Sequence, residues 1–366
     1  MRILHLVWRG RFSGAEMLVR DLALYHRRQG HEIAIAGLGP TEVSFRPEID
    51  ALAESGVSWY APMQAQSRLG KLMKLRRTVA KFTPDIIIAH AIIPAFYART
   101  FALLLPCPIM TVLHCGSCDD YAEQGAWSER RLSHRAAAVV AVSNVSLDNY
   151  RRRIGEHPRL CHIRNGVSLR RYRTWPEDRA TIRRSLGLTD DERVLLQIGR
   201  VSRIKRQHLT MAALGRLKDA GKQVTTLFLG PSEDAGYAQE LANDLARFGL
   251  ADRVRLLGGR TDVPALLLAA DALAMPSSTE SQGLALIEGL AAGLPVVASQ
   301  LPAFSSFAGL PGVTLLDPQD TAAYAEALDQ ALSSPRHQHD LDEWDLAATA
   351  DNYLTLATDL IAAHRH

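Results

Sequence analysis

Residues 270–299, ADALAMPSSTESQGLALIEGLAAGLPVVAS, contain the pattern that decides the fold. The apolar run that ends near Pro276 is typical of a buried strand, TESQG of a turn, and LALIEGLAAG of a helix that Gly293 closes. A second apolar run, LPVVAS, follows at once and indicates another buried strand. This succession of strand, helix and strand predicts a parallel sheet covered by helices.

The same alternation of apolar runs and helical patterns extends over the whole chain. It favours an α/β protein with parallel sheets that carry helices on both faces. Two series of strands are expected, separated by a charged segment. The first lies within residues 2–8, 31–38, 57–62, 85–90, 108–114, 137–143 and 161–165, and the second within 193–200, 224–230, 253–259, 270–277, 294–299 and 313–317.

Two doubly wound domains are therefore expected, in line with a length of 366 residues and a hydrophobic content of 47%. The join lies around residues 163–192, where Asn-Gly, Pro176 and mixed charges interrupt the apolar pattern. We predict an N-terminal domain over 1–170, a C-terminal domain over 171–345, and a closing helix over 346–366 that packs back on the first domain. Because ligands of open α/β sheets bind beyond the carboxyl ends of the strands, a cleft between the domains is the expected site.

The net charge of +3 conceals an asymmetry. Residues 1–175 hold 25 Lys and Arg against 14 Asp and Glu, whereas the remainder holds 17 against 25. The basic clusters, such as KLMKLRRTVAKF, suit an anionic membrane surface or an acidic acceptor. Leu72, Leu75, Val79 and Phe82 in that cluster have a helical spacing that suits docking on the core equally well. Nucleic acid is disfavoured, because the clusters lack interleaved aromatic residues.

Neither the start of the chain nor its cysteines indicate export. The apolar run after Met1 is too short for a signal peptide, and no apolar segment is long enough to span a bilayer, which predicts a cytoplasmic protein. Among Cys107, Cys115, Cys118 and Cys161 there is one C-x-x-C pair. Without a second pair or suitably spaced histidines, reduced thiols are favoured over a zinc site.

Three stretches carry residues that can bind an anionic, hydroxyl-rich ligand. Gly14 in RGRFSGAE precedes a helix expected over residues 15–29, although a tight turn without a ligand fits the stretch equally well. Arg200 and Lys205 follow the strand that Gly199 ends, where two cations suit a diphosphate, and the alternative is solvated loop charge. The same loop also contains Arg203 and Arg206, whose side chains could be the ones that point outward into solvent.

The opening stretch adds two carboxylates and a helix start. Glu280 lies just before the predicted helix, whose unpaired N–H groups from Ser281 to Leu284 attract a phosphate. Glu288 lies among apolar neighbours, where an unpaired charge is costly, so a ligand is the more economical partner than solvent. Carboxylates accept hydrogen bonds from hydroxyl-rich rings.

These motifs resemble the family 4 glycosyltransferases, which have the GT-B fold of two Rossmann-like domains that face a central cleft. The resemblance rests on PSSTESQGLALIEGLAAGLPVVAS, similar to the family's E-x7-E signature, and on FSGAE, GHEIAI, TVLHCG, VVAVS, IRNGV and IGRVSRIK in the family's order. It covers almost the whole chain. Departures occur at Ser13-Gly14, at Lys205-Arg206 and after residue 299, and they concern loop geometry.

The resemblance implies a nucleotide diphosphate sugar as co-substrate, most often a UDP- or GDP-sugar, with no metal and no cofactor. It implies contacts of His114 and Glu280 with the donor sugar, of Arg200 and Lys205 with the diphosphate, and of Glu288 with the ribose. The remaining substrate-binding residues that it implies are Gly14 near the phosphates, Gly258, Gly259 and Arg260 near the base, and Ser281, Gln282, Gly283 and Leu284 at the sugar and phosphate.

The resemblance thus implies a retaining glycosyltransferase, which we expect to act on a glycan or lipid-linked acceptor in cell-surface polysaccharide or lipopolysaccharide synthesis. Its basic N-terminal domain would face the acceptor and contact the inner face of the cell membrane. Two alternatives keep the fold: a nucleotide-sugar epimerase or hydrolase, and a non-catalytic protein that binds nucleotide sugars. Release of free sugar without an acceptor would favour the first, and tight binding without turnover the second.

Overall fold

The computed structural model describes residues 1–60, 67–114 and 123–365. The chain folds into two compact units. Unit 1 comprises Met1–Gly166 together with Glu343–His366, and unit 2 comprises Val167–Asp342. Among the described residues, no helix combines the length and the apolar character needed to cross a bilayer.

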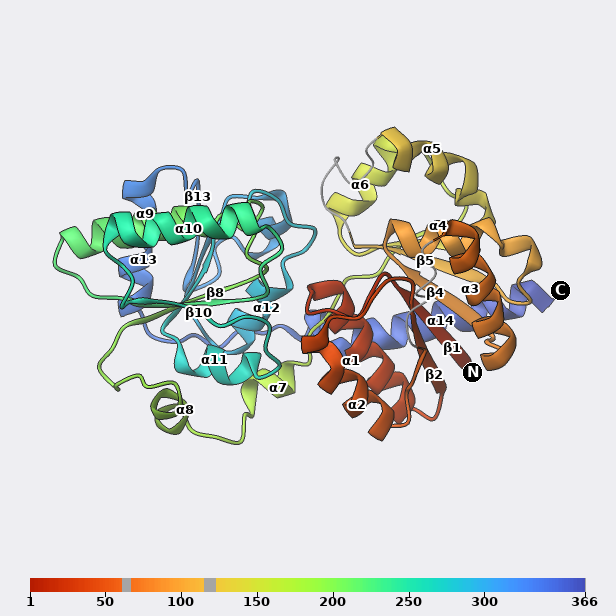
Figure 1. Ribbon diagram of the computed structural model, residues 1–366, viewed down its shortest axis with the longest axis horizontal. Coiled ribbons are helices and arrows are strands. Elements are labelled where there is room, and N and C mark those ends of the chain that lie inside the picture. Colours follow the sequence, from red (N-terminus) through yellow and green to blue (C-terminus); the bar gives the residue numbers. More distant parts are fainter. Residues whose placement is uncertain (61–66, 115–122, 366) are drawn as a thin grey trace. The chain divides into compact units, whose positions relative to one another are not determined.

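Unit 1 is built on a parallel sheet with the order β3-β2-β1-β4-β5-β6-β7 in the described part of the chain. Figure 1 labels β2, β1, β4 and β5 of this sheet. The strands are Arg2–Val7 (β1), Glu32–Gly37 (β2), Ser58–Tyr60 (β3), Ile86–His90 (β4), Ile109–Leu113 (β5), Ala138–Ala141 (β6) and Leu160–His162 (β7). The helices are Gly14–Arg28 (α1), Arg46–Glu54 (α2), Arg68–Phe82 (α3), Ile92–Thr100 (α4), Glu123–Leu132 (α5), Asn144–Arg153 (α6) and Leu346–Arg365 (α14).

The sheet of unit 1 is buried on both faces, and its apolar side chains alternate between them. Ile86 and Ile88 of β4 belong to a cluster with α1 and α14, whereas Ile87 and Ala89 belong to a cluster with α3 and α4. This alternation follows from the twofold periodicity of a strand. The sheet is therefore doubly wound.

The C-terminal helix α14 belongs to unit 1. Its apolar face joins the cluster that covers β1, and α14 lies beside α1, as Figure 1 also shows. His26 of α1 contacts the carbonyl oxygen of Ala350 through Nε2 at 3.1 Å. The residues of α14 that pack in this way are Leu346, Ala350, Tyr353, Ala357 and Leu360.

Unit 2 has a second parallel sheet, with the order β10-β9-β8-β11-β12-β13 among the described strands. Its strands are Val194–Ile198 (β8), Thr225–Leu229 (β9), Val254–Leu256 (β10), Ala272–Met275 (β11), Val296–Ser299 (β12) and Val313–Leu316 (β13). Its helices are Leu169–Arg173 (α7), Arg179–Ser185 (α8), Gln207–Asp219 (α9), Ala235–Phe248 (α10), Val263–Ala269 (α11), Leu284–Ala291 (α12) and Thr321–Ser333 (α13).

Short 3₁₀ helices complete the described chain. The segment after β12 forms one of them, η5 at Pro302–Phe307. Its Phe304 is completely buried. The others are Val43–Phe45 (η1), Ala102–Leu104 (η2), Ser133–Arg135 (η4) and Asp342–Trp344 (η6).

Every strand expected from the sequence is present, and α1 and α12 begin within one residue of their expected positions. The apolar stripe of α3 is a core face: Leu75, Val79 and Phe82 are buried, and Leu72 packs partly against the same cluster. The stripe therefore docks on the sheet and cannot also face a membrane.

Candidate functional site

Two adjacent strands of unit 2, β8 and β11, carry the charged residues that the sequence singles out. Arg200 and Lys205 follow β8, and Glu280 follows β11. Because neighbouring parallel strands end at the same edge of a sheet, these three residues lie at one carboxyl edge. The charged cluster is thus a product of the strand order.

Glycines allow the loops at this edge to approach one another closely. Gly199 and Gly230, directly after β8 and β9, both have φ of +147°, and the N–H of Gly230 donates to the carbonyl oxygen of Gly258 at 2.8 Å. A Cβ atom on Gly230 would collide with the backbone of Gly199. Glycine is therefore required where the β8 and β9 loops meet.

Lys205 and Glu280 form an ion pair between the ends of β8 and β11. Their side chains are only 18% and 11% exposed. The hydroxyl of Ser277 also donates to Oε1 of Glu280, at 2.8 Å. The predicted roles are a phosphate contact for Lys205 and a sugar contact for Glu280, and in the structure the two side chains neutralise each other.

Arg200 has a different carboxylate partner, Glu233, which lies in the loop after β9. The side chains of this pair are 32% and 27% exposed, so water screens the pair more than it screens Lys205 and Glu280. Arg203 points outward: its side chain is 61% exposed and pairs with Asp234 and Glu240. Arg200 and Lys205 are therefore the two cations at the strand ends.

The N-terminus of α12 lies in the loop that holds Glu280. Gly283 is its N-cap residue, with φ of +78°, and no side chain among the described residues caps the helix there. A Cβ atom on Gly283 would overlap the ring of Phe304. The helix start thus consists of backbone held in a glycine-only conformation, with main-chain N–H groups at Ser281–Leu284.

Glu288, one turn further along α12, has a partner that the sequence did not reveal. The hydroxyl of Tyr172 in α7 donates to Oε1 of Glu288 at 2.7 Å. Tyr172 therefore gives this half-buried carboxylate a hydrogen-bond partner within the protein, and its contact with a ligand stays a prediction. The bond also fixes where the Glu288 side chain lies.

Gly258, Gly259 and Arg260 follow β10, beside β9. Gly258 is exposed, with φ of +67° and open space where a Cβ atom would stand. Arg260 binds Asp262 through two nitrogens, at 2.8 and 2.6 Å, and this hydrogen bonding lowers the pKa of the Asp262 carboxyl. The Arg260 side chain is thus engaged within the loop.

In unit 1, Gly14 is the exposed first residue of α1. The start of this helix already has an anionic partner of its own. Ser13 donates its hydroxyl to Glu16, and Arg11 lies 3.4 Å from the same carboxylate. Within the described chain neither α1 nor α12 has a side-chain cap, but an incoming phosphate at Gly14 would meet the buried carboxylate of Glu16 close by.

His114 directly follows β5 and is held by other histidines. Its Nε2 lies 3.0 Å from Nδ1 of His90, and Nε2 of His90 lies 3.0 Å from Nδ1 of His5. Burial lowers the pKa of His114 to about 4, so the ring is neutral near pH 7. The sequence did not lead us to predict His5 and His90 as partners of His114. The one feature that could have indicated His90 is its position at the end of the apolar run DIIIAH.

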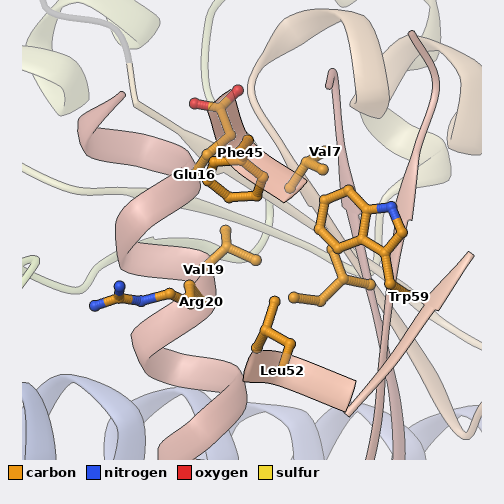
Figure 2. Close-up of a pocket in the computed structure, with 8 residues that line it drawn as sticks. Val7, Glu16, Val19, Arg20, Phe45, Leu52 and Trp59 are labelled. Carbon is orange, nitrogen blue, oxygen red and sulfur yellow. The ribbon is translucent and has the colours of Figure 1, made fainter. Parts of the chain in front are cut away.

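A small cavity of unit 1 lies between α1 and the sheet (Figure 2). Val7, Val19, Leu52 and the ring of Trp59 surround it, and Arg20 directs its guanidinium away from it. That guanidinium is bound to Glu48 at 2.6 Å. None of the predicted site residues lines this cavity, so it is a packing gap of the core.

Cys115 and Cys118, the predicted C-x-x-C pair, lie outside the described residues. Of the described cysteines, Cys107 is buried and Cys161 half-buried, and both are free thiols. Burial raises the pKa of Cys107 to about 12, which makes its thiol inert. Within the ranges that the structure describes, no group of histidines, cysteines and carboxylates is arranged to hold a metal ion.

Comparisons with known proteins address both units. Residues 12–171 match the family described as Glycosyltransferase Family 4, and residues 178–344 match the family described as Glycosyl transferases group 1. The D-inositol 3-phosphate glycosyltransferase 2 of Catenulispora acidiphila is 30% identical over 257 residues, which are 64% of this chain and 60% of that protein. The D-inositol 3-phosphate glycosyltransferase of Thermobifida fusca is 32% identical over 216 residues, 56% of this chain and 48% of that protein.

The chain thus spans about half the length of the curated relatives that it matches. Similarity to solved structures extends further. The crystal structure of Anabaena HepE in complex with UDP-glucose covers 98% of this chain and 100% of its own, with a TM-score of 0.79 and 24% identity. At that identity the likeness establishes the fold, which is GT-B.

Proposed function

Because the chain belongs to the family 4 glycosyltransferases, we propose that it transfers a sugar from a nucleotide diphosphate sugar to a hydroxyl of a glycan or lipid-linked acceptor. The observation that carries the proposal is the edge of the unit 2 sheet. Lys205 and Glu280 form an ion pair there, Arg200 follows the same strand as Lys205, and the start of α12 has no side-chain cap among the described residues. Two cations, a carboxylate and a helix start are what a diphosphate with an attached sugar requires.

The donor diphosphate would take over the partners of Arg200 and Lys205. In the structure, Glu233 and Glu280 neutralise these cations. A diphosphate carries more charge and more acceptor oxygens than a carboxylate, and the N–H groups of α12 add to its binding. Release of Glu280 from Lys205 then leaves its carboxylate available for hydroxyls of the donor sugar.

Glu288 would hold the ribose of the nucleotide. Its carboxylate accepts hydrogen bonds, which suits ribose hydroxyls, and Tyr172 donates to Oε1 and holds the group in place. The main chain of Gly258, Gly259 and Arg260 would lie along the base. On unit 1, Gly14 would contact the phosphates and His114 the donor sugar. Among the donors, we favour a uridine diphosphate sugar, because the structurally similar Anabaena protein was solved with UDP-glucose.

The reaction proposed is a front-face substitution that retains the anomeric configuration. The bond from the anomeric carbon to the phosphate oxygen breaks, the bond to the acceptor oxygen forms, and the departing phosphate oxygen takes the acceptor's proton. Arg200, Lys205 and the start of α12 would stabilise the negative charge on the leaving group, which is the role a metal ion has in other transferases. No protein nucleophile is required.

The test is turnover with a panel of uridine, guanosine and adenosine diphosphate sugars in the presence of EDTA. We expect sugar transfer with one preferred donor, which Glu288→Ala weakens and which Arg200→Ala or Lys205→Ala lowers more strongly. If all three variants retain donor binding and turnover, the site assignment is wrong. Release of free sugar without an acceptor would instead identify a hydrolase, and interconversion of donor epimers an epimerase.

The acceptor side would involve the basic surface of unit 1 at the cytoplasmic face of the membrane. Leu69 and Met73 of α3 are 64% and 50% exposed, and they alternate with the basic residues Arg68, Lys71 and Lys74. Exposed apolar side chains among cations suit an anionic bilayer surface.

Sedimentation with phosphatidylglycerol vesicles tests this contact. The double variant Leu69→Asp/Met73→Asp should bind the vesicles less than the unaltered chain does. The control variant Val43→Asp changes a residue that is 77% exposed elsewhere on unit 1, and it should bind the vesicles as the unaltered chain does. Equal vesicle binding by the double variant and the control would contradict the membrane contact.

A further inference from the structure

Three histidines form a continuous hydrogen-bonded series across adjacent strands of unit 1. His5 lies in β1, His90 ends β4, and His114 follows β5. These strands are neighbours in the sheet, and Figure 1 shows β1, β4 and β5 together. The ring nitrogens are 3.0 Å apart at each of the two contacts, and successive rings are stacked at 5.3 and 5.2 Å between centroids.

All three imidazoles are neutral near pH 7. His5 is completely buried and His90 is 2% exposed. Burial lowers the pKa of His5 to about 3 and places the pKa of His90 well below its usual range. A neutral imidazole carries one N–H donor and one bare acceptor nitrogen, so the two contacts must run in one common direction.

The inner end of the series decides that direction. Nε2 of His5 is buried, and it has no hydrogen-bond partner among the described residues. An orphaned buried N–H is rarer in proteins than an under-used acceptor, so this nitrogen is the bare one. His5 therefore carries its proton on Nδ1 and donates to Nε2 of His90. His90 in turn donates from Nδ1 to Nε2 of His114, and the proton of His114 must lie on Nδ1.

A fourth histidine supports the inner end. The ring of His26 in α1 stacks on that of His5, with 6.1 Å between centroids and 13° between planes. Nε2 of His26 donates to the carbonyl oxygen of Ala350 at 3.1 Å, and its Nδ1 is the buried nitrogen without a partner in the described chain. The same rule thus places the proton of His26 on the bonded nitrogen. Helix α14, which carries Ala350, supports the stack that holds His5 in place.

We propose that His5 and His90 are positioning residues that hold His114 as the neutral tautomer protonated on Nδ1, so that His114 offers its ligand a hydrogen-bond donor. Among the described residues, no group pairs with that nitrogen, and His114 is only half-buried. An N–H at this position would bind a ligand oxygen. The identity of the ligand, an oxygen of the donor sugar, rests on the proposed function, whereas the tautomer does not.

Nitrogen NMR of the full chain, labelled with ¹⁵N-histidine, tests the tautomer without any ligand. His114→Gln identifies the His114 signals by their loss. We expect Nδ1 of His114 to be the protonated nitrogen between pH 6 and 8, and we expect His90→Phe to introduce the form protonated on Nε2. Protonation of His114 on Nε2 in the unaltered chain would overturn the proposal, as would an unchanged pattern in His90→Phe.

Donor kinetics separate a positioning role from a merely structural one. His90→Phe removes the donor to His114 and should raise KM for the donor about fivefold, the effect of one neutral hydrogen bond, with a smaller change in kcat. His90→Asn keeps an N–H close to the position of Nδ1 and should restore KM to within about twofold. Equal losses in both variants would contradict the role. If His90→Phe does not fold, the NMR spectrum of the unaltered chain still shows which nitrogen of His114 is protonated. That result does not depend on whether a nucleotide sugar binds.

Discussion

The two units of this protein prepare polar groups for a ligand in opposite ways. In unit 2, the side chains of Arg200 and Lys205 form ion pairs with Glu233 and Glu280. In unit 1, His114 is neutral, and its hydrogen-bonding character is set by His90 and, through it, by His5. Charge governs the first arrangement and tautomer the second.

The difference teaches where each kind of group can be placed. The charged pairs lie at the ends of strands, with a fifth to a third of the Arg200 and Lys205 side chains exposed, so water remains available during an exchange of partners. The histidines lie inside the sheet, where a charge would be costly and a neutral ring is stable. A cation in an exposed ion pair can exchange its carboxylate partner for a ligand. The tautomer of a buried histidine, in contrast, is set by its neighbours before any ligand binds.

The largest expected effect comes from removing a cation of unit 2. Lys205→Ala should lower kcat/KM for the donor about a hundredfold, because charge stabilisation in an enclosed site depends strongly on each donor. Arg203→Ala is the matched control: Arg203 lies in the same loop but points into solvent, and its loss should change kcat/KM less than about twofold. Similar losses in the two variants would remove the distinction between the strand-end cations and ordinary loop charge.

The next effect concerns pH and the histidines of unit 1. Burial lowers the pKa of His5 to about 3 and that of His26 to about 4, so below pH 6.5 the unfolded chain binds protons that the folded chain excludes. The free energy of unfolding should therefore fall as the pH is lowered from 7 to 5, by about 2 kcal/mol for each such histidine. Urea unfolding at both pH values measures this fall.

His5→Phe sharpens the pH prediction, because phenylalanine keeps a buried ring and cannot bind a proton. The fall in unfolding free energy between pH 7 and 5 should be smaller in this variant by about 2 kcal/mol. An identical fall in the variant and the unaltered chain would mean that His5 is not excluded from protonation by the fold.

The smallest effect concerns Tyr172, which positions Glu288 in unit 2 much as His90 positions His114 in unit 1. Tyr172→Phe removes the hydroxyl that donates to Oε1 and should weaken donor binding about fivefold. Tyr25→Phe removes a comparable tyrosine–carboxylate bond, to Asp351 at 3.0 Å, on the exposed surface of unit 1, and it should leave donor binding unchanged. Calorimetric titration with the preferred donor compares the two, and an equal effect would argue against a positioning role for Tyr172.

The strands and their order of appearance could be predicted because each is a short apolar run bounded by turn residues. The run LLQIG, for example, ends at Gly199 because that residue needs a φ of +147°, and the same glycine marks the strand end in the sequence. The position of Glu280 before a helix was equally readable, since TESQG separates a strand from a helical pattern. Local backbone chemistry governs both features.

The partners of the site residues could not be predicted, because they depend on the order of the strands. Lys205 and Glu280 are 75 positions apart and meet only because β8 lies next to β11. His5 reaches His90 only because β4 pairs with β1. Tyr172 and Glu288, 116 positions apart, meet through contact of α7 with α12, which no local pattern encodes.

The central claim is that the charged edge of the unit 2 sheet binds a nucleotide diphosphate sugar. The most direct measurement is the shift in Tm that uridine, guanosine and adenosine diphosphate sugars produce in EDTA, in the unaltered chain, in Arg203→Ala, and in Arg200→Ala with Lys205→Ala. We predict that one donor raises Tm in the first two proteins, because a ligand that binds only the folded state stabilises it, and that the shift is lost in the double variant. An undiminished shift in the double variant, or no shift with any donor, would contradict the claim.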